Sequence, residues 1–260
     1  MSGMLNLPAL VIRETDYDEN DKLLTLLTAE KGKLTVRVRG GKSLKNKHLA
    51  SCQLLCYSEF TVSERGGFHT LSEAALIEQF FGLRRELSRF ALAQYAADVA
   101  GEVCVENSDE SEMLQLLLNT LYMLSETDRP TDFIKAVFEL RCASLSGFCP
   151  ALAGCSVCGK PEGEPTYLDV MNGSIRCGDC FTDGGAVGPA DRGTATVILP
   201  LSPATLRAMR YVTDAPAKRI FSFSLSEAET ADLVRVTETY LLHQLGRGFR
   251  TLDFYNRIRE

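Results

Sequence analysis

The stretch Cys155-Ser-Val-Cys158-Gly-Lys-Pro-Glu-Gly-Glu-Pro-Thr-Tyr-Leu-Asp-Val-Met-Asn-Gly-Ser-Ile-Arg-Cys177-Gly-Asp-Cys180 holds two Cys-x-x-Cys pairs with eighteen residues between them. Each pair presents two thiolates from one tight turn, and two such turns supply the four sulfur ligands that tetrahedral zinc prefers. Between the pairs, two short strand patterns flank Asn172-Gly173, a favoured hairpin turn that returns the second pair to the first. The stretch therefore predicts a small fold built around one metal ion.

The four predicted ligands, Cys155, Cys158, Cys177 and Cys180, close the coordination shell, so we expect one structural zinc rather than a catalytic one. The alternatives are unrelated free thiols, a disulfide pair, or a redox-active motif of the thioredoxin type, which is a single motif beside a βαβ unit. The five other cysteines lie in apolar patterns, where a free thiol acts as a small hydrophobe. They are Cys52, Cys56, Cys104, Cys142 and Cys149.

Outside this stretch, the chain of 260 residues has the composition of a globular protein, with 45% hydrophobic and 24% charged residues. Its net charge of −6 excludes a protein that coats nucleic acid over its whole surface, so any such binding must be local. No apolar run reaches the roughly 18 residues of a membrane helix, and the first residues lack the features of a signal peptide. Nine cysteines are an odd number, below the density of a disulfide scaffold, which favours the reducing cytoplasm.

The first 80 residues alternate apolar and polar side chains in short runs separated by turn residues, a pattern typical of successive strands. Such a set of short strands suggests a small closed barrel of the oligonucleotide-binding type, in which closure removes exposed sheet edges. The five predicted strands are Ala9–Thr15, Lys22–Ala29, Lys33–Arg39, Gln53–Ser63 and Phe68–Gln79.

From Leu83 the apolar residues repeat at three and four positions, which indicates amphipathic helices. The expected helices are 83–103, 113–124, 133–145 and, opened by Ser226 and stopped by Gly246, 227–245, and we expect them to share one bundle. The sequence thus predicts a multidomain α+β protein. Its parts are a barrel (1–82), a helical domain (83–148 and 194–260) and a zinc-binding segment (149–193).

A local basic run lies between residues 31 and 47, with seven positive charges and no acidic residue. Alternation along the third strand places Lys33, Arg37 and Arg39 on one face, and Gly40-Gly41 then turns the chain into a lysine-rich loop. Such a face on a barrel of this type would meet phosphates. The candidate DNA-binding residues are Lys33, Arg37, Arg39, Lys42, Lys45 and Lys47.

Aromatic residues near this run could add stacking surface if they point outward, namely Tyr57, Phe60 and Phe68. The alternative is a solvated charged face with all three aromatics in the core, and the neighbouring acids of residues 16–21 could neutralise part of the charge. A further basic set, Arg247, Arg250, Arg257 and Arg259, follows the last expected helix, and a tail in solvent explains it as well as a binding role.

No catalytic pattern accompanies these features. The three histidines lie in no metal or nucleophile motif, and the sequence lacks a P-loop, a G-x-S-x-G elbow and a helix-opening G-x-G-x-x-G. A zinc deaminase would need H-x-E before its Cys-x-x-Cys, and none is present. We therefore expect a protein that is not an enzyme.

The order of barrel, helices and four-cysteine segment resembles the bacterial RecO family of recombination mediators. The run Lys31-Gly-Lys-Leu-Thr-Val-Arg-Val-Arg-Gly40 is similar to the family's third strand, and Gly67-Phe-His-Thr-Leu-Ser-Glu-Ala74 resembles its "L-x-T-L-x-E-A" strand. Leu145-Ser-Gly-Phe-Cys-Pro-Ala-Leu152 resembles the "G-x-x-P-x-L" segment before its zinc pair, and Tyr240-Leu-Leu-His-Gln-Leu-Gly-Arg247 resembles its last helix. The resemblance covers nearly the whole chain.

The resemblance implies a non-enzymatic, nucleoid-associated protein that binds single- and double-stranded DNA and anneals complementary strands. It also implies that the protein works with RecR to load recombinase and receives the acidic C-terminal tail of single-stranded DNA-binding protein. The loop here is rich in lysine where the family often has arginine.

Two other classes of protein stay open. One is a zinc-stapled protein–protein interaction module without DNA affinity, and the other is a nuclease-like enzyme with unrecognised carboxylates. We expect a monomer, because four helices in one bundle leave no apolar helix unpaired.

Overall fold

The computed structural model describes residues 3–161, 163–182 and 197–259. The chain forms two compact units, one made of Met1–Thr131 with Phe249–Glu260 and the other of Asp132–Gly248. Each unit contains its own sheet and its own helices.

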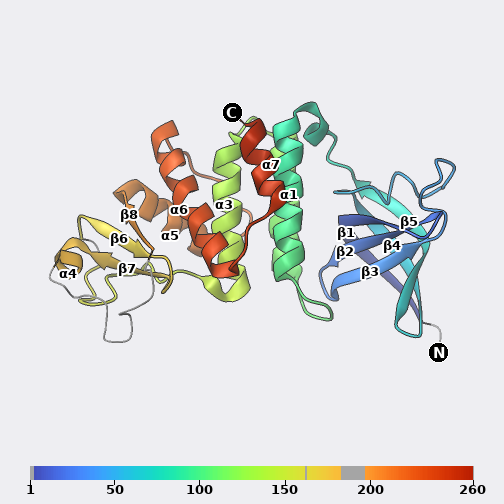
Figure 1. Ribbon diagram of the computed structural model, residues 1–260, viewed down its shortest axis with the longest axis horizontal. Coiled ribbons are helices and arrows are strands. Elements are labelled where there is room, and N and C mark those ends of the chain that lie inside the picture. The colour runs from blue at the N-terminus through green and yellow to red at the C-terminus, as the bar shows by residue number, and fades with distance from the viewer. Residues whose placement is uncertain (1–2, 162, 183–196, 260) are drawn as a thin grey trace. The chain divides into compact units, whose positions relative to one another are not determined.

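Five strands of the first unit close into a barrel in the order β1-β2-β3-β5-β4 (Figure 1). All neighbouring pairs are antiparallel except β3 and β5, whose short parallel pairing closes the barrel. The strands are β1 (Gly3–Tyr17), β2 (Asp21–Thr28), β3 (Gly32–Val38), β4 (Tyr57–Arg65) and β5 (Phe68–Glu78). The five-stranded barrel predicted from the sequence is confirmed.

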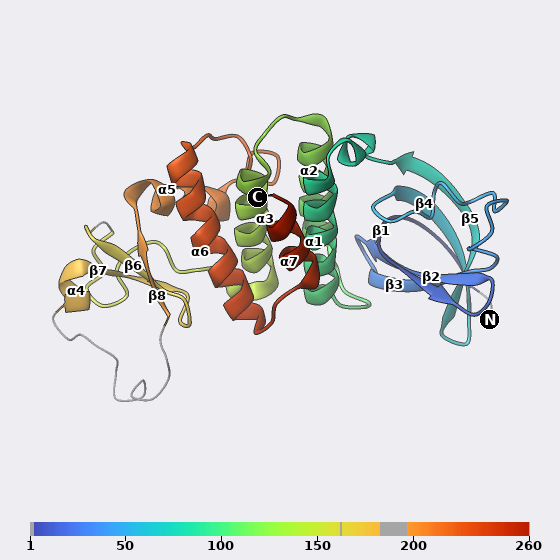
Figure 2. The same cartoon turned by 45° about the horizontal axis from the view of Figure 1, so that its top comes forward.

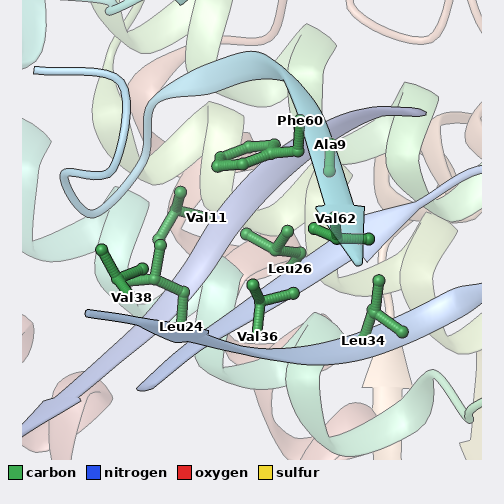
Figure 3. Close-up of a cluster of buried hydrophobic side chains, with 9 residues drawn as sticks. All are labelled: Ala9, Val11, Leu24, Leu26, Leu34, Val36, Val38, Phe60 and Val62. Atoms are coloured by element: carbon green, nitrogen blue, oxygen red, sulfur yellow. The ribbon is translucent and has the colours of Figure 1, made fainter. Parts of the chain in front are cut away.

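Alternate residues of the strands point into the barrel and form its core (Figure 3). On β3 the side chains of Leu34, Val36 and Val38 are buried, which leaves Lys33, Thr35 and Arg37 on the outer face. Burial of each Val, Leu or Phe contributes about 1.5–3 kcal/mol, so the core holds that outer face on a stable frame. The core residues are Ala9, Val11, Leu24, Leu26, Leu34, Val36, Val38, Phe60 and Val62.

The predicted fourth strand is wrong at its start, because β4 begins at Tyr57 rather than at Gln53. Residues 39–56 form a loop, yet Leu55 and Cys56 are buried. The Val11 N–H donates to the Cys56 carbonyl (3.0 Å), and the Leu55 N–H donates to the Val11 carbonyl (2.8 Å). An apolar run therefore marks a loop held against β1, not a strand.

The helices of the first unit are the 3-10 turn η1 (Phe81–Arg85), α1 (Leu87–Val103), α2 (Ser111–Glu126) and α7 (Arg250–Ile258). The helix expected from Leu83 begins four residues later, because residues 81–85 form η1.

Of the two interpretations of the C-terminal arginines, a binding role stays a prediction, whereas a solvated tail does not describe residues 250–258, which form helix α7. It contacts α1, and the Phe249 ring before it lies edge-on to Tyr95 with centroids 5.7 Å apart. Leu252 and Tyr255 are buried, so apolar residues at three-residue spacing hold the segment in place.

The second unit combines a three-stranded antiparallel sheet with helices (Figure 2). The sheet, in the order β7-β6-β8, is made of β6 (Thr166–Asp169), β7 (Ser174–Cys177) and β8 (Ile198–Leu201). The helical elements are α3 (Thr131–Ala143), the π-turn η2 (Ser144–Phe148), α4 (Gly178–Thr182), α5 (Pro203–Asp214) and α6 (Glu227–Leu245). The sequence did not predict β8, α4 or α5.

Helix α6 has the bounds that its end signals predicted. The Ser226 side chain and the Glu229 backbone and side chain form a reciprocal capping box, and Gly246 ends the helix in the left-handed region at φ 64°.

The two units divide the four predicted helices, with α1 and α2 in the first and α3 and α6 in the second. The three-part domain division stays a prediction, and its boundary at residues 193 and 194 lies outside the described residues.

Candidate metal centre and nucleic-acid interface

The two cysteine pairs lie at the β7 edge of the small sheet. Cys155 and Cys158 belong to a turn closed by hydrogen bonds from the Gly159 N–H to the Cys155 carbonyl (2.9 Å) and from the Cys155 N–H to the Lys160 carbonyl (2.8 Å). Gly159 has φ 73°, a left-handed conformation that favours glycine. The Ser156 N–H donates to Ile175 of β7 (2.8 Å) and so attaches this first turn to the strand that carries the second pair.

The second pair continues directly from the sheet, because Cys177 ends β7 and Cys180 lies in α4. Gly163 passes so close to Cys177 that an added Cβ would lie 2.6 Å from the Cys177 Cβ. The hairpin predicted between the pairs is confirmed by the antiparallel pairing of β6 with β7.

The structure brings all four predicted ligands together. Their four Sγ atoms lie within 4.8 Å of one another, and those of Cys158 and Cys177 are 3.7 Å apart. Four sulfurs at about 2.3 Å from a central tetrahedral ion are about 3.8 Å from each other. The cluster can therefore hold a metal ion.

The surroundings favour the thiolate at Cys155, whereas hydrogen bonds with the Cys158 and Cys177 sulfurs raise the pKa of Cys180 to about 12. Burial raises the pKa of the Cys155 thiol, but backbone N–H groups at Cys158, Cys177 and Val157 together lower it to about 6. The Lys160 ammonium, 3.2 Å from Asp179, has a raised pKa because of that carboxylate and the nearby Cys158 and Cys177 sulfurs. A thiolate is the form that binds a metal ion.

The predicted DNA-binding residues fall into three groups, and the first is Lys33 alone. Its Nζ donates to the Gly101 carbonyl near the end of α1 (2.7 Å). Lys33 therefore faces α1 and lies apart from the loop that carries the lysines.

The second group contains cations paired with carboxylates. Asp21 accepts from the Arg37 Nε and Nη2 (both 2.6 Å) and from the Gly40 N–H (2.8 Å). The Gly40 N–H and the Arg37 guanidinium lower the pKa of Asp21. Lys42 donates to the Asp18 carbonyl (2.8 Å) and lies 3.6 Å from the Asp16 carboxylate.

Lys47 is also paired, with its Nζ 2.7 Å from Glu73 of β5. The third group, Arg39 and Lys45, is exposed, and the part of the chain that the structure describes offers neither side chain a hydrogen bond or an ion pair. These two cations are the most available to an outside anion.

The aromatic residues near the basic run divide between core and surface. Phe60 is fully buried, so it offers no stacking surface and takes the core position that the sequence left open. Tyr57 is partly buried, and Phe68 is 79% exposed at the start of β5. The sequence analysis missed Tyr17 at the end of β1, where the Arg37 guanidinium carbon lies 5.3 Å from the ring centroid. Its place directly before the acidic turn could have indicated an exposed ring.

Among the described residues, the four cysteines are the group of potential ligands close enough to share an ion. Within the same residues, no helix is both long and apolar enough to cross a bilayer.

The fold and the sites define a protein with an oligonucleotide-binding type of barrel, a helical part and a separate four-cysteine metal site. Comparison with known proteins gives the family. The model described as Recombination protein O N terminal matches residues 1–80, and the model described as Recombination protein O C terminal matches residues 84–253. The chain belongs to the RecO family of DNA repair proteins, which supports a role as a mediator of recombination in DNA repair.

Curated relatives match over almost their full length. A DNA repair protein RecO of Acetivibrio thermocellus is 32% identical, and the match covers 98% of this chain and 97% of the relative. A DNA repair protein RecO of Symbiobacterium thermophilum is 28% identical over 99% of this chain and 98% of the relative. One of Bacillus pumilus is 29% identical over 96% of this chain and 92% of the relative.

Proposed function

We propose that this protein is a non-enzymatic recombination mediator that binds single- and double-stranded DNA, anneals complementary strands and helps to load recombinase together with RecR. The observation that carries the proposal is a pair of exposed cations, Arg39 and Lys45, which have no ion-pair partner among the described residues. They lie beside a barrel of the oligonucleotide-binding type in a chain of the RecO family. Exposed cations on a fixed frame attract phosphates and release the counterions condensed on DNA.

The proposed DNA-binding surface contains the six predicted residues, and each of the three groups has a different role in it. Arg39 and Lys45 meet phosphates directly. Lys42 and Lys47 do so by exchanging an exposed carboxylate for a phosphate, since an exposed ion pair contributes only about 0–1 kcal/mol. Lys33 and Arg37 mainly hold the surface in place through Gly101 and Asp21.

We further propose that the ion held by the four cysteines is a single structural zinc. Four sulfur ligands at tetrahedral spacing are the donor set that zinc prefers, and they leave no position for a reacting water. The ion then holds together a segment too small to bury a core of its own.

We propose that the protein has two protein partners, RecR and the C-terminal tail of single-stranded DNA-binding protein. We also propose that the chain is a monomer. In this proposal the barrel domain (1–82) binds DNA and the helical domain (83–148 and 194–260) binds the tail. The third domain is the zinc-binding segment (149–193). Support for these partners comes from the family to which the chain belongs.

Fluorescence anisotropy of a labelled single strand of roughly 20 nucleotides, measured at several salt concentrations, tests DNA binding. Each phosphate contact contributes about −0.7 to the slope of log K against log salt. Replacing Arg39 and Lys45 together with glutamine should make the slope shallower by about 1.4. The matched control replaces the exposed Lys218 and Arg219 of the second unit with glutamine, and this double substitution should leave the slope unchanged.

One observation favours a second candidate, a protein–protein interaction module without DNA affinity. Four of the six predicted cations are already engaged within the chain, namely Lys33, Arg37, Lys42 and Lys47. If the wild-type protein binds no single strand even at low salt, this second function replaces the first.

A further inference from the structure

Tyr17 is an aromatic residue outside the barrel core. It ends β1 opposite Asp21, at the start of the turn that leads into β2, and it is 43% exposed. A tyrosine ring that contributes nothing to the barrel core and stays partly open to solvent offers a flat apolar surface at the edge of the barrel.

The guanidinium group of Arg37 lies over this ring, and its ion pair with Asp21 holds it in place. Its guanidinium carbon is 5.3 Å from the Tyr17 centroid, and its Nε and Nη2 are both held by Asp21. Asp21 in turn is fixed by the Gly40 N–H. Two of the donors that would bind a phosphate are therefore occupied by Asp21, which holds the guanidinium beside the Tyr17 ring.

The charges around the pair disfavour a phosphate there. Asp18 lies 3.7 Å from the Arg37 guanidinium, and two further exposed carboxylates are close in the chain, Asp16 at the end of β1 and Glu19 in the turn. These carboxylates repel phosphates but not the uncharged base of a nucleotide. The loop beyond Gly40 is tied to the same turn, because the Lys42 N–H donates to the Asn20 carbonyl (3.1 Å), so the loop cations lie on an adjoining segment.

We propose that Tyr17 and Arg37 form a stacking platform for an unpaired nucleobase, while the loop cations take the neighbouring phosphates. The inference rests on the proposed DNA binding. It assigns the base of a nucleotide to Tyr17 and Arg37 and the phosphates to the loop cations. Aromatic rings and guanidinium planes stack on any base, so the platform favours single strands, whose bases are open, over duplex.

The absence of tryptophan from the chain makes a direct test available. Tyr17→Trp introduces a single tryptophan at the platform, and stacking of a base on it quenches its fluorescence. The probes are an oligothymidylate of roughly 20 nucleotides and an abasic strand with the same number of phosphates. Both are added at concentrations at which anisotropy shows them bound. We expect quenching by the first strand and none by the second.

The control is Tyr122→Trp, which places the fluorophore at an exposed tyrosine of α2 and should show no quenching. Equal quenching by both strands, or binding without quenching, overturns the platform and leaves DNA binding intact. Absence of any strand binding by the wild-type protein overturns the proposed function and the platform together.

Affinity provides a second measurement. Tyr17→Ala should weaken single-strand binding roughly 5- to 150-fold, the range for losing one base–aromatic stack, and Tyr17→Phe should restore it because the ring alone stacks. A loss in Tyr17→Ala that Tyr17→Phe fails to restore contradicts stacking, as does an unchanged affinity in Tyr17→Ala. Thermal unfolding of each variant checks that the barrel is intact.

Discussion

At the scale of single residues, the metal centre depends on each of its four sulfurs. Cys177→Ser removes a ligand where β7 ends and leaves three thiolates in a cluster whose shell needs four. We expect the variant to lose bound zinc and to unfold at a lower temperature than the wild type. Metal analysis checks occupancy, and Cys149→Ser, at an exposed thiol outside the cluster, is the control. Full occupancy in Cys177→Ser would show that the ligand assignment is wrong.

Asp21 is the residue on which the basic loop depends for its position. Its pKa is lowered in the folded protein by the Gly40 N–H and the Arg37 guanidinium, so its stabilising effect is present above the unfolded pKa near 3.8. That effect is lost as the pH falls through the folded pKa. Asp21→Asn should therefore lower stability at neutral pH.

The difference between wild type and Asp21→Asn should shrink as the pH falls from about 5 to about 3, as measured by urea unfolding. The exposed Asp214 of α5 provides a matched control, because Asp214→Asn should change stability little at either pH. A difference that stays constant with pH would mean that the carboxylate charge is not what holds the loop.

At the scale of elements, α7 shows how a short helix is held by few residues. Leu252 is 3% exposed, whereas Phe254, two residues later, is 44% exposed. Leu252→Ala should cost about 2–5 kcal/mol of unfolding free energy, as for other buried leucines, and Phe254→Ala should change it by no more than about 0.5 kcal/mol. Equal effects in a urea titration would mean that α7 is not anchored by its buried face.

Helices α3 and α6 of the second unit are joined by a buried ionic network. The Lys135 Nζ lies 2.8 Å from Glu139 and 2.7 Å from Glu238, and the Thr237 hydroxyl donates to Glu139. Burial alone lowers the pKa of Lys135, but the two carboxylates outweigh burial and raise it, so the lysine is charged.

Lys135→Met leaves two carboxylates without their cation and should cost about 3–5 kcal/mol. Lys218→Met, at an exposed lysine, is the control and should have little effect. Denaturant unfolding compares the two, and a cost below about 1 kcal/mol for Lys135→Met would show that the network is solvated.

The elements that the sequence predicted are those whose signals are local. Alternation along β3 and the start of α6 after Ser226 are set by neighbouring residues, and both predictions are confirmed. The loop that carries Leu55 was mistaken for a strand because burial against β1 comes from tertiary contacts. The same holds for the site: cysteine spacing predicted the metal cluster, whereas the contact of Arg37 with Tyr17 depends on the pairing register of β1, β2 and β3.

At the scale of the whole molecule, the two candidate sites belong to different units. The cysteine cluster lies in the unit Asp132–Gly248, and the basic loop and Tyr17 lie in the unit that contains the barrel. Among the residues that the structure describes, the four potential ligands belong to one unit, and the hydrogen-bond partners of the basic loop belong to the other. Loss of one site should therefore leave the chemistry of the other unchanged.

Removal of zinc by a strong chelator tests that separation. The chelated protein should lose stability in the second unit, because the ion joins the turn of Cys155 and Cys158 to the end of β7 and to α4. It should nevertheless bind a single strand within about twofold of the untreated affinity, since effects at sites without shared partners add to within about 0.5 kcal/mol. The reciprocal control is the Arg39 and Lys45 double substitution, which should keep one zinc while weakening strand binding. A large fall in affinity on chelation would mean that the metal segment takes part in holding DNA, and the barrel would then not be the whole of the interface.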